Sequence, residues 1–249
     1  MSDPLLTLQG VHTHIGSYHI LHGVDLAVPA GQVTMLLGRN GAGKTTTLRT
    51  IMGLWPASKG RLRFDGQPIG GETSRLATPD IAQLGIAYVP ENMGIFSDLT
   101  VRENMLLAAR NARTPDQLDT QRLDWLFGLF PALKTFWLTP AGKLSGGQKQ
   151  MLAIARAMVE PRRLLLIDEP SKGLAPAIVQ NLISVLRELK ATQTTVLLVE
   201  QNFAVARALG DQVAVMDDGR VVHCGAMAEL ADDTGLQQKF LGLSLGAHA

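Results

Sequence analysis

One stretch of nine residues carries the densest chemical signal in the sequence. It reads Gly38, Arg39, Asn40, Gly41, Ala42, Gly43, Lys44, Thr45 and Thr46. This is the spacing G-x-x-x-x-G-K-[ST], in which glycines let the backbone wrap closely around phosphates and turn several N–H groups toward one anion. The lysine can reach the β- and γ-phosphates of a nucleotide, and the hydroxyl of the next threonine can ligate Mg²⁺. We therefore predict that this phosphate loop (residues 38–46) binds a nucleotide.

The sequence on either side of the phosphate loop supplies the context that the motif requires. Residues 33–37 form a mainly apolar run typical of a buried strand, and residues 45–52 are expected to form a helix that stops at Gly53. In a strand–loop–helix unit the positive end of the helix points at the bound phosphates. A chance match in a glycine-rich turn is the alternative, but it would not account for the flanking strand and helix.

The composition of the chain bounds the kind of protein it is. A length of 249 residues suits one large α/β domain or two small ones. The formal net charge of +1 gives no electrostatic argument for a nucleic-acid partner, and the single cysteine, Cys224, cannot form an internal disulfide. The first residues do not resemble a cleavable signal, and no apolar run approaches the ~20 residues of a membrane span. We expect a soluble chain that reaches a membrane only through a partner.

Apolar periodicity predicts an alternation of strands and helices. The expected strands are two between residues 5 and 26, then 61–64 bounded by Gly60 and Asp65, 85–91, 164–167, 195–199, 212–216 and 220–223, with a loop at 70–73. The alternation favours a mostly parallel sheet, which antiparallel pieces at the N-terminus and at the last hairpin make mixed. Residues 99–143 are mostly helical after a capping box at Thr100, and we expect them to form an inserted subdomain.

A second motif lies far along the chain from the phosphate loop. Residues 144–148 read Leu-Ser-Gly-Gly-Gln and open a strongly periodic helix, and the apolar run 164–167 then ends in Asp168 and Glu169. A serine helix cap followed by two glycines would explain the local structure of residues 144–148, but not why this motif occurs together with the phosphate loop and the strand that ends in Asp168 and Glu169. The three motifs in this order resemble the ATP-binding domains of ABC-type ATPases. A P-loop kinase or GTPase is the alternative, but the Leu-Ser-Gly-Gly-Gln helix has no role there.

The resemblance covers essentially the whole chain, from about residue 5 to residue 241. It implies a single nucleotide-binding domain over residues 1–249 of the α/β class, with a P-loop NTPase core whose mixed, mostly parallel sheet is flanked by helices. The core, together with an antiparallel β subdomain, would span residues 5–98 and 144–249. The helical subdomain would span residues 99–143.

Finer features are similar to one of the two ATPase subunits of bacterial branched-chain amino-acid importers. In that subfamily Glu91 stands for the usual Q-loop glutamine, Gln201 for the switch histidine, and Ala175 for the D-loop aspartate. The resemblance implies transmembrane permease subunits, a second ATPase subunit (a sister chain or another copy) and, indirectly, an extracytoplasmic solute-binding protein. It also implies a peripheral location at the cytoplasmic face of the bacterial inner membrane. Importers of urea, amides or other amino acids, and ABC ATPases outside transport, remain alternatives.

The resemblance also assigns roles to individual residues. Glu169 would deprotonate the attacking water as a general base, Gln201 would donate its amide N–H groups to the γ-phosphate or the water, and Lys44 would hold the phosphates of ATP. The residues implied in Mg²⁺ binding are Thr45, Asp168 and Glu91, of which the last would also link to the membrane subunit. A second phosphate cradle, for the ATP of a facing subunit, is implied at Ser145, Gly146, Gly147 and Gln148.

The chain departs from the subfamily at a few positions. The aromatic residue that stacks on adenine in the family aligns with Ile15, and Tyr18 lies three positions later, so either could contact the base. Lys172 replaces a D-loop residue that is usually apolar. Residues 136–138, Phe-Trp-Leu, stand where the family is mostly polar, and we interpret them as additional core of the helical subdomain rather than an interaction patch.

Overall fold

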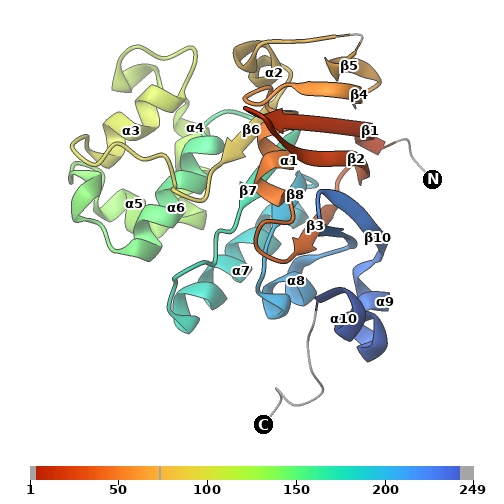
Figure 1. Cartoon of the computed structure of the whole chain (residues 1–249). Helices are drawn as coiled ribbons and strands as arrows, with labels where there is room; N and C mark the ends of the chain where they lie inside the picture. The colour runs from red at the N-terminus through yellow and green to blue at the C-terminus, as the bar shows by residue number, and fades with distance from the viewer. Residues whose placement is uncertain (1–3, 73, 242–249) are drawn as a thin grey trace.

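The computed structural model describes residues 4–72 and 74–241, and within them the strands gather into two sheets (Figure 1). The strands are β1 (Pro4–Ile15), β2 (Tyr18–Pro29), β3 (Val33–Gly38), β4 (Ala57–Phe64), β5 (Gln67–Gly71), β6 (Ile86–Val89), β7 (Leu164–Asp168), β8 (Thr195–Val199), β9 (Gln212–Asp217) and β10 (Arg220–Ala226). The α-helices are α1 (Lys44–Ile51), α2 (Thr78–Gln83), α3 (Val101–Ala108), α4 (Thr120–Leu129), α5 (Pro131–Thr135), α6 (Gly146–Ala157), α7 (Pro176–Ala191), α8 (Phe203–Leu209), α9 (Met227–Asp232) and α10 (Thr234–Leu241), with 3-10 turns η1 (Pro115–Gln117) and η2 (Ala141–Lys143).

The larger sheet holds the strand that leads into the phosphate loop. Its order is β10-β9-β3-β8-β7-β6, and every neighbouring pair is parallel except β9 with β10. The parallel register pairs Leu36 of β3 with Val199 of β8, and Val199 with Asp168 of β7. The phosphate loop, Asp168 and the residues after Val199 therefore meet at one edge of the sheet, where open parallel sheets bind their ligands.

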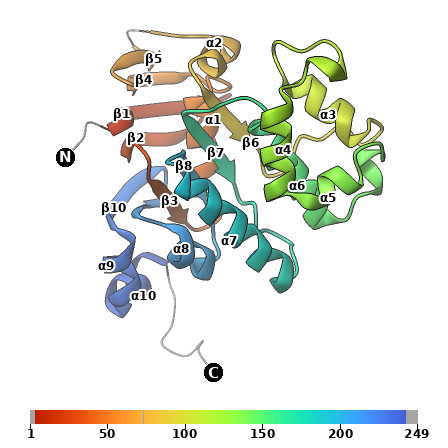
Figure 2. The same cartoon turned by 180° about the vertical axis from the view of Figure 1, so that it is seen from behind.

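The smaller sheet is antiparallel and has the order β2-β1-β4-β5. Helix α1 lies between this sheet and the larger one, and its buried Leu48 and Ile51 share a core with strands of both. Seen from behind, α7 and α8 cover the opposite face of the larger sheet (Figure 2). The mixed sheet flanked by helices and the separate antiparallel sheet confirm the expected α/β architecture.

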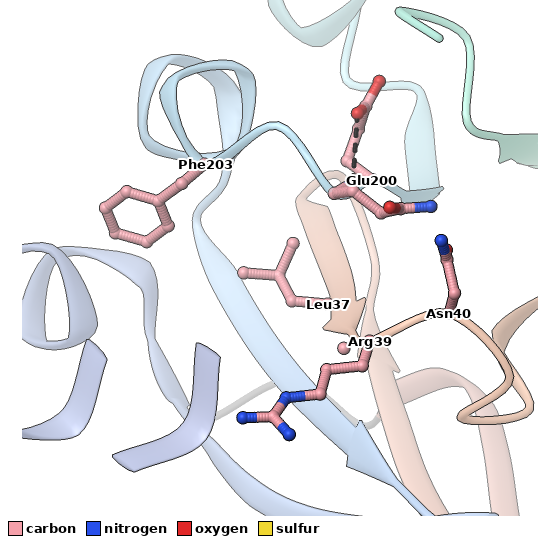
Figure 3. Close-up of a pocket in the computed structure, with 7 residues that line it drawn as sticks. Leu37, Arg39, Asn40, Glu200 and Phe203 are labelled. Atoms are coloured by element: carbon pink, nitrogen blue, oxygen red, sulfur yellow. Dashed lines mark hydrogen bonds between the residues drawn. The ribbon is translucent and has the colours of Figure 1, made fainter. Parts of the chain in front are cut away.

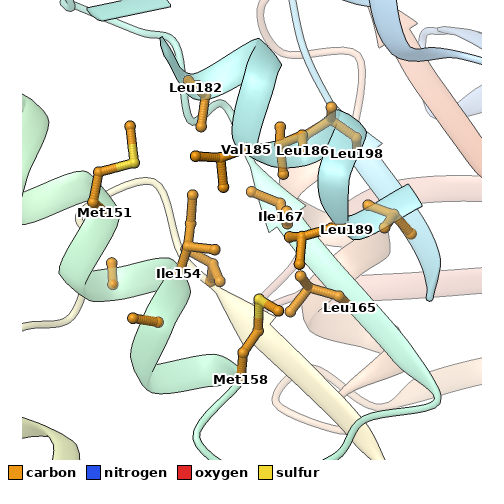
Figure 4. Packing of buried hydrophobic residues seen from close by; sticks show 14 of the residues in the cluster. Met151, Ile154, Met158, Leu165, Ile167, Leu182, Val185, Leu186, Leu189 and Leu198 are labelled. Atoms are coloured by element: carbon orange, nitrogen blue, oxygen red, sulfur yellow. The ribbon is translucent and has the colours of Figure 1, made fainter. Parts of the chain in front are cut away.

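The central strands are apolar throughout because both of their faces are covered. Along β7, Leu164 and Leu166 face α1, whereas Leu165 and Ile167 face the helices of the other side. Figure 4 shows the second contact, in which α6 and α7 pack onto β7 and β8 through Met151, Ile154, Met158, Leu182, Val185, Leu186, Leu189 and Leu198. Full burial of each such side chain stabilises the fold by roughly 1.5–3 kcal/mol, so this packing fixes the edge at which the polar residues converge.

Helices α3 to α6 stand to one side of the sheets in both views (Figures 1 and 2). The capping box at Thr100 is confirmed, because its hydroxyl accepts from the N–H of Glu103 and the Glu103 carboxylate accepts from the N–H of Thr100. The fully buried Asn104 accepts from the N–H of Phe96 and donates to its carbonyl, at 2.9 Å each. These bonds hold the segment after Glu91 against α3.

Two local predictions about glycines were wrong. Gly60 does not bound β4, which begins at Ala57 and passes through Gly60 at φ 85°, where a Cβ atom would lie 2.3 Å from the carbonyl oxygen of Gly10. A glycine here lets β4 approach an irregular part of β1. Gly70 and Gly71 lie in β5 rather than in a loop, whereas Thr73 lies outside the described residues.

Residues 136–138 divide between core and surface. Phe136 and Trp137 pack against the larger core, and the ring of Trp137 meets that of Phe127 edge to face. Leu138 is mostly exposed. None of the helices that the structure describes has both the length and the apolar character needed to cross a membrane.

Candidate active site

The phosphate loop runs from the end of β3 into the first turn of α1. Gly43 caps this helix in a left-handed conformation, at φ 100°, that a residue with a Cβ atom rarely adopts. Gly38 is also left-handed, and a Cβ atom there would lie 2.2 Å from the carbonyl oxygen of Met216. The glycines therefore permit the tight path that points the first N–H groups of α1 into the site.

Lys44 lies inside the loop rather than in solvent. Its Nζ donates to the carbonyl oxygens of Gly38 and Arg39, at 2.9 Å each, and lies 3.8 Å from Oε1 of Glu169. Burial lowers the pKa of the ammonium, which the nearby carboxylates of Glu169 and Asp168 counteract. The loop carbonyls thus hold the positive charge beside the space that phosphates would enter.

Asp168 ends β7 and contacts two hydroxyl groups. Thr45 Oγ1 donates to its Oδ1 at 3.1 Å, and the phenol of Tyr88 on β6 donates to its Oδ2 at 3.2 Å. Burial raises the pKa of Asp168, and burial also raises that of Tyr88 to about 12, so the phenol keeps its proton. Among the described residues no group of three or more histidine, cysteine, aspartate or glutamate side chains could hold a metal ion. The threonine and aspartate oxygens fit Mg²⁺, which usually takes one or two carboxylates and completes its shell with substrate phosphates and water.

The backbone conformation of Glu169 sets the direction of its side chain. It takes a left-handed conformation, at φ 47°, and its N–H donates to the carbonyl of Val199 at 2.9 Å. Its carboxylate accepts from Nε2 of Gln201 at 2.5 Å. Because β7 and β8 are neighbours, the structure brings these two predicted catalytic residues together beside Lys44.

Glu91 follows β6 and reaches the same site from the other side. Its Oε1 lies 2.5 Å from Nζ of Lys172, which also lies 3.4 Å from Oε2 of Glu169. The hydrogen bond to Glu91 is the main reason that the pKa of Lys172 is raised. Sequence reasoning noted Lys172 as unusual but assigned it no contact.

A cavity of about 350 Å³ opens over these groups. Its lining is formed by Ile15, Ile20, Asn40, Gly41, Gly43, Lys44, Thr45, Thr46, Glu91, Glu169 and Lys172. Tyr18, the aromatic candidate for stacking on adenine, is 74% exposed and is not part of this lining. The geometry therefore favours Ile15, together with Ile20, as the apolar surface for a base.

A separate hollow of about 260 Å³ shares only Asn40 with that cavity. Figure 3 shows it between Leu37 and Arg39 on one side and Phe203 of α8 on the other, with the carboxylate of Glu200 pointing away. Lys44 and Glu169 do not line this hollow, whereas Gln201 does. The residues that would hold the phosphates therefore line mainly the larger cavity, and Gln201 approaches Glu169 from the smaller one.

The Leu-Ser-Gly-Gly-Gln motif forms a helix start away from both cavities. Ser145 caps α6, and its hydroxyl oxygen accepts from the N–H of Gln148 at 3.3 Å. In return, the side-chain oxygen of Gln148 accepts from the N–H of Ser145 at 2.8 Å. A Cβ atom on Gly147 would lie 2.5 Å from Ile178, so this glycine lets α6 approach α7. Ser145 and Gly146 are exposed and line neither cavity. The chain thus presents a second helix start, at Ser145, that does not border the cavity of its own phosphate loop.

Glu200 is a buried carboxylate to which sequence reasoning assigned no role. It is 2% exposed and accepts from the N–H and the hydroxyl of Ser171, at 3.0 and 2.8 Å, and from the N–H groups of Gln201 and Asn202. Burial raises its pKa, and these hydrogen bonds oppose the shift. The only sequence signal was an acidic residue directly after a buried strand. Glu200 ties the turn after β7 to the turn after β8, and so sets where Glu169 and Gln201 meet.

Replacing Glu200 with glutamine is expected to destabilise the chain by about 1–3 kcal/mol, because one carboxylate oxygen becomes an N–H₂ group that faces donors. Urea unfolding at neutral pH measures this. Ser171→Ala is the matched control, since it removes one donor and leaves no donor facing another, and it is expected to cost less. A Glu200→Gln variant as stable as the parent chain would show that these bonds do not secure the two turns.

Comparison with known proteins identifies similar sequences and structures. The family model described as ABC transporter matches residues 21–172. A high-affinity branched-chain amino acid transport ATP-binding protein of Pseudomonas aeruginosa is 39% identical over 239 residues, which cover 96% of this chain and all of that protein. A probable branched-chain amino acid transport ATP-binding protein of Archaeoglobus fulgidus is 34% identical, over 90% of this chain and 93% of its own. The solved structure of cbiO1 from Clostridium perfringens, part of the ABC transporter complex cbiONQ, aligns with a TM-score of 0.80 at 28% identity, over 96% of this chain and 94% of its own.

Proposed function

The chain belongs to the ABC transporter family of ATP-binding proteins, and we propose that it hydrolyses ATP to drive the import of branched-chain amino acids. The observation that carries the chemistry is that Lys44 and Glu169 line one cavity beside the Thr45–Asp168 pair, and that Gln201 contacts Glu169 from the adjoining hollow. The full-length similarity to branched-chain amino acid transport proteins supports the solute class.

The side chains divide the reaction among them. Glu169 takes a proton from water as the water oxygen bonds to the γ-phosphorus, and the bond to the β–γ bridging oxygen breaks to release ADP. Gln201, which contacts Glu169, orients that water or the γ-phosphate. Lys44 and the N–H groups at the start of α1 hold the phosphates. Mg²⁺, bound by Thr45 and Asp168 with Glu91 nearby, would neutralise charge on the β- and γ-phosphates.

The second helix start, at Ser145, supports a facing ATPase subunit as a partner. One ATP needs a single cradle, so the N-terminus of α6 is free to meet the γ-phosphate held by a facing ATPase subunit, either a sister chain or a second copy. ATP would then join the two subunits, and hydrolysis would let them part. Coupled to two permease subunits at the cytoplasmic face of the inner membrane, and fed by an extracytoplasmic solute-binding protein, this cycle would drive uptake.

Uptake by the reconstituted complex tests the proposal. The chain is purified with its permease subunits, placed in proteoliposomes with the solute-binding protein, and assayed for ATP-dependent uptake of labelled leucine, arginine and urea. We expect leucine uptake. Uptake of urea or arginine without leucine would assign another solute, and ATP hydrolysis by the assembled complex without uptake of any of the three solutes would contradict the proposal.

Replacing Phe96 with alanine is expected to lower uptake by roughly tenfold while basal ATPase activity stays within about twofold. Phe96 is 49% exposed, its backbone is pinned by Asn104, and its ring lies 5.2 Å from the guanidinium of Arg156. Phe96 does not line the ATP cavity, and its exposed ring is available to a permease. Leu54→Ala, another exposed apolar side chain, is the matched control. Equal losses of uptake and ATPase activity in Phe96→Ala would indicate a role in the catalytic core instead.

A further inference from the structure

The ammonium of Lys172 joins two carboxylates at the edge of the ATP cavity. Its Nζ lies 2.5 Å from Glu91 Oε1 and 3.4 Å from Glu169 Oε2, and all three residues line the cavity. Each residue comes from a different segment: Glu91 follows β6, Glu169 follows β7, and Lys172 lies in the turn before α7. The contact therefore ties together three segments that border the cavity.

The charges in the cavity explain why a cation is held there. The carboxylates of Glu91, Asp168 and Glu169 lie around the same site, and the negative charge of each one disfavours the ionised form of the others. The ammonium of Lys44 is occupied by the loop carbonyls and lies 3.8 Å from Glu169. Lys172 supplies the positive counter-charge that Glu91 would otherwise lack.

We propose that Lys172 is a built-in cation that competes with divalent metal for Glu91. This inference rests on the proposed ATPase function. With no nucleotide bound, the ammonium neutralises Glu91 and holds it toward Glu169. When Mg²⁺ and ATP enter, Glu91 exchanges the ammonium for the metal or for its water shell, and the turn that carries Lys172 is released. Lys172 thus acts as a positioning residue that sets how much Mg²⁺ the site requires.

The proposal predicts opposite effects with and without metal. Without Mg²⁺, Lys172 is one of two ammonium groups facing the ATP anion, so its loss should weaken ATP binding. With Mg²⁺, Lys172 holds the Glu91 carboxylate that the metal needs, so loss of Lys172 should strengthen binding of the metal. Because the side chain is 57% exposed, solvent screening limits both effects to severalfold rather than orders of magnitude.

Binding of a fluorescent ATP analogue to the purified chain tests this without relying on turnover. For Lys172→Leu we expect the Mg²⁺ concentration at half-maximal binding to fall by roughly 3- to 10-fold, and the Kd measured in EDTA to rise by roughly 2- to 5-fold. Lys172→Arg keeps the charge and should behave as the parent chain in both titrations. Lys134→Leu, which removes an exposed lysine on α5, should change neither.

The outcomes separate this inference from the proposed function. If Lys172→Leu leaves the Mg²⁺ requirement unchanged, or moves both quantities in the unfavourable direction, Lys172 does not compete with metal. If Lys172→Arg resembles Lys172→Leu, the side chain acts through its shape and not its charge, and the proposal also fails. If the parent chain binds no ATP analogue at all, the proposed ATPase function is what fails.

Discussion

Replacing Glu169 with glutamine is expected to lower ATP turnover by ~10²–10⁴-fold while leaving ATP binding nearly intact. The amide has almost the size of the carboxylate but cannot take a proton from water. The left-handed backbone at residue 169, the N–H bond to Val199 and the burial of the side chain all remain after the substitution. The loss should therefore be confined to the proton-transfer step.

Three measurements check this prediction. Steady-state ATPase assays give turnover, and a fluorescent ATP analogue gives affinity, which should change by less than about threefold because Lys44 and the loop N–H groups are untouched. Gel filtration with Mg²⁺ and ATP should show a dimer that persists. Glu188→Gln, an exposed acid on α7, is the control and should match the parent. Turnover within tenfold of the parent in Glu169→Gln would exclude Glu169 as the base.

Much of the site could be predicted because its signals are local. The strand, loop and helix around the phosphate loop are contiguous, so glycine spacing and apolar periodicity indicate all three. The apolar runs that became β7 and β8 are buried on both faces, and a parallel sheet brings their carboxyl ends to one edge. The roles of Glu169 and Gln201 came from the family resemblance, and their 2.5 Å contact depends on which strands are neighbours.

The contacts that the sequence did not predict all join separate elements. Tyr88 reaches Asp168 from β6, Ser171 bonds to Glu200, and Lys172 reaches Glu91, and none of these pairs has a characteristic spacing along the chain. Ile15 could not be chosen over Tyr18, because the two residues are paired across one hairpin and which of them borders the cavity depends on how that hairpin packs against the phosphate loop. The sequence predicts that Gly60 bounds the strand, because a glycine inside a strand and a glycine beyond its end look alike in sequence.

The largest effect after Glu169 is expected at Ser145, whose position in the structure argues for a role in another subunit's site. Ser145 caps α6, so the free N–H groups of this helix start and the serine hydroxyl are available to an anion. Ser145 is exposed and belongs to neither cavity beside the phosphate loop. We therefore propose that the anion bound there is the γ-phosphate held by a facing subunit.

Ser145→Arg should therefore abolish turnover, by ~10²-fold or more, and leave ATP affinity of the single chain within about threefold. The arginine would fill the space of the facing γ-phosphate without touching Lys44. Ser184→Arg places the same side chain on the exposed surface of α7 and should retain activity. A loss of affinity above tenfold in Ser145→Arg would mean that the chain's own ATP is bound there, and would contradict a site shared between subunits.

Mixing two inactive chains gives the sharper test of this shared site. A Ser145→Arg chain has an intact phosphate loop, and a Lys44→Ala chain has an intact Ser145 helix. If each site combines the loop of one subunit with the helix of the other, their mixed dimer contains one wholly intact site and one doubly damaged site. Random pairing at equal concentrations should then restore up to about a quarter of the parent activity, because half the dimers are mixed and each has one working site. When the chain pairs with a sister ATPase, the two substitutions are placed on opposite partners. If the loop and helix of one chain formed the site together, every combination would stay inactive, so activity on mixing distinguishes the two arrangements.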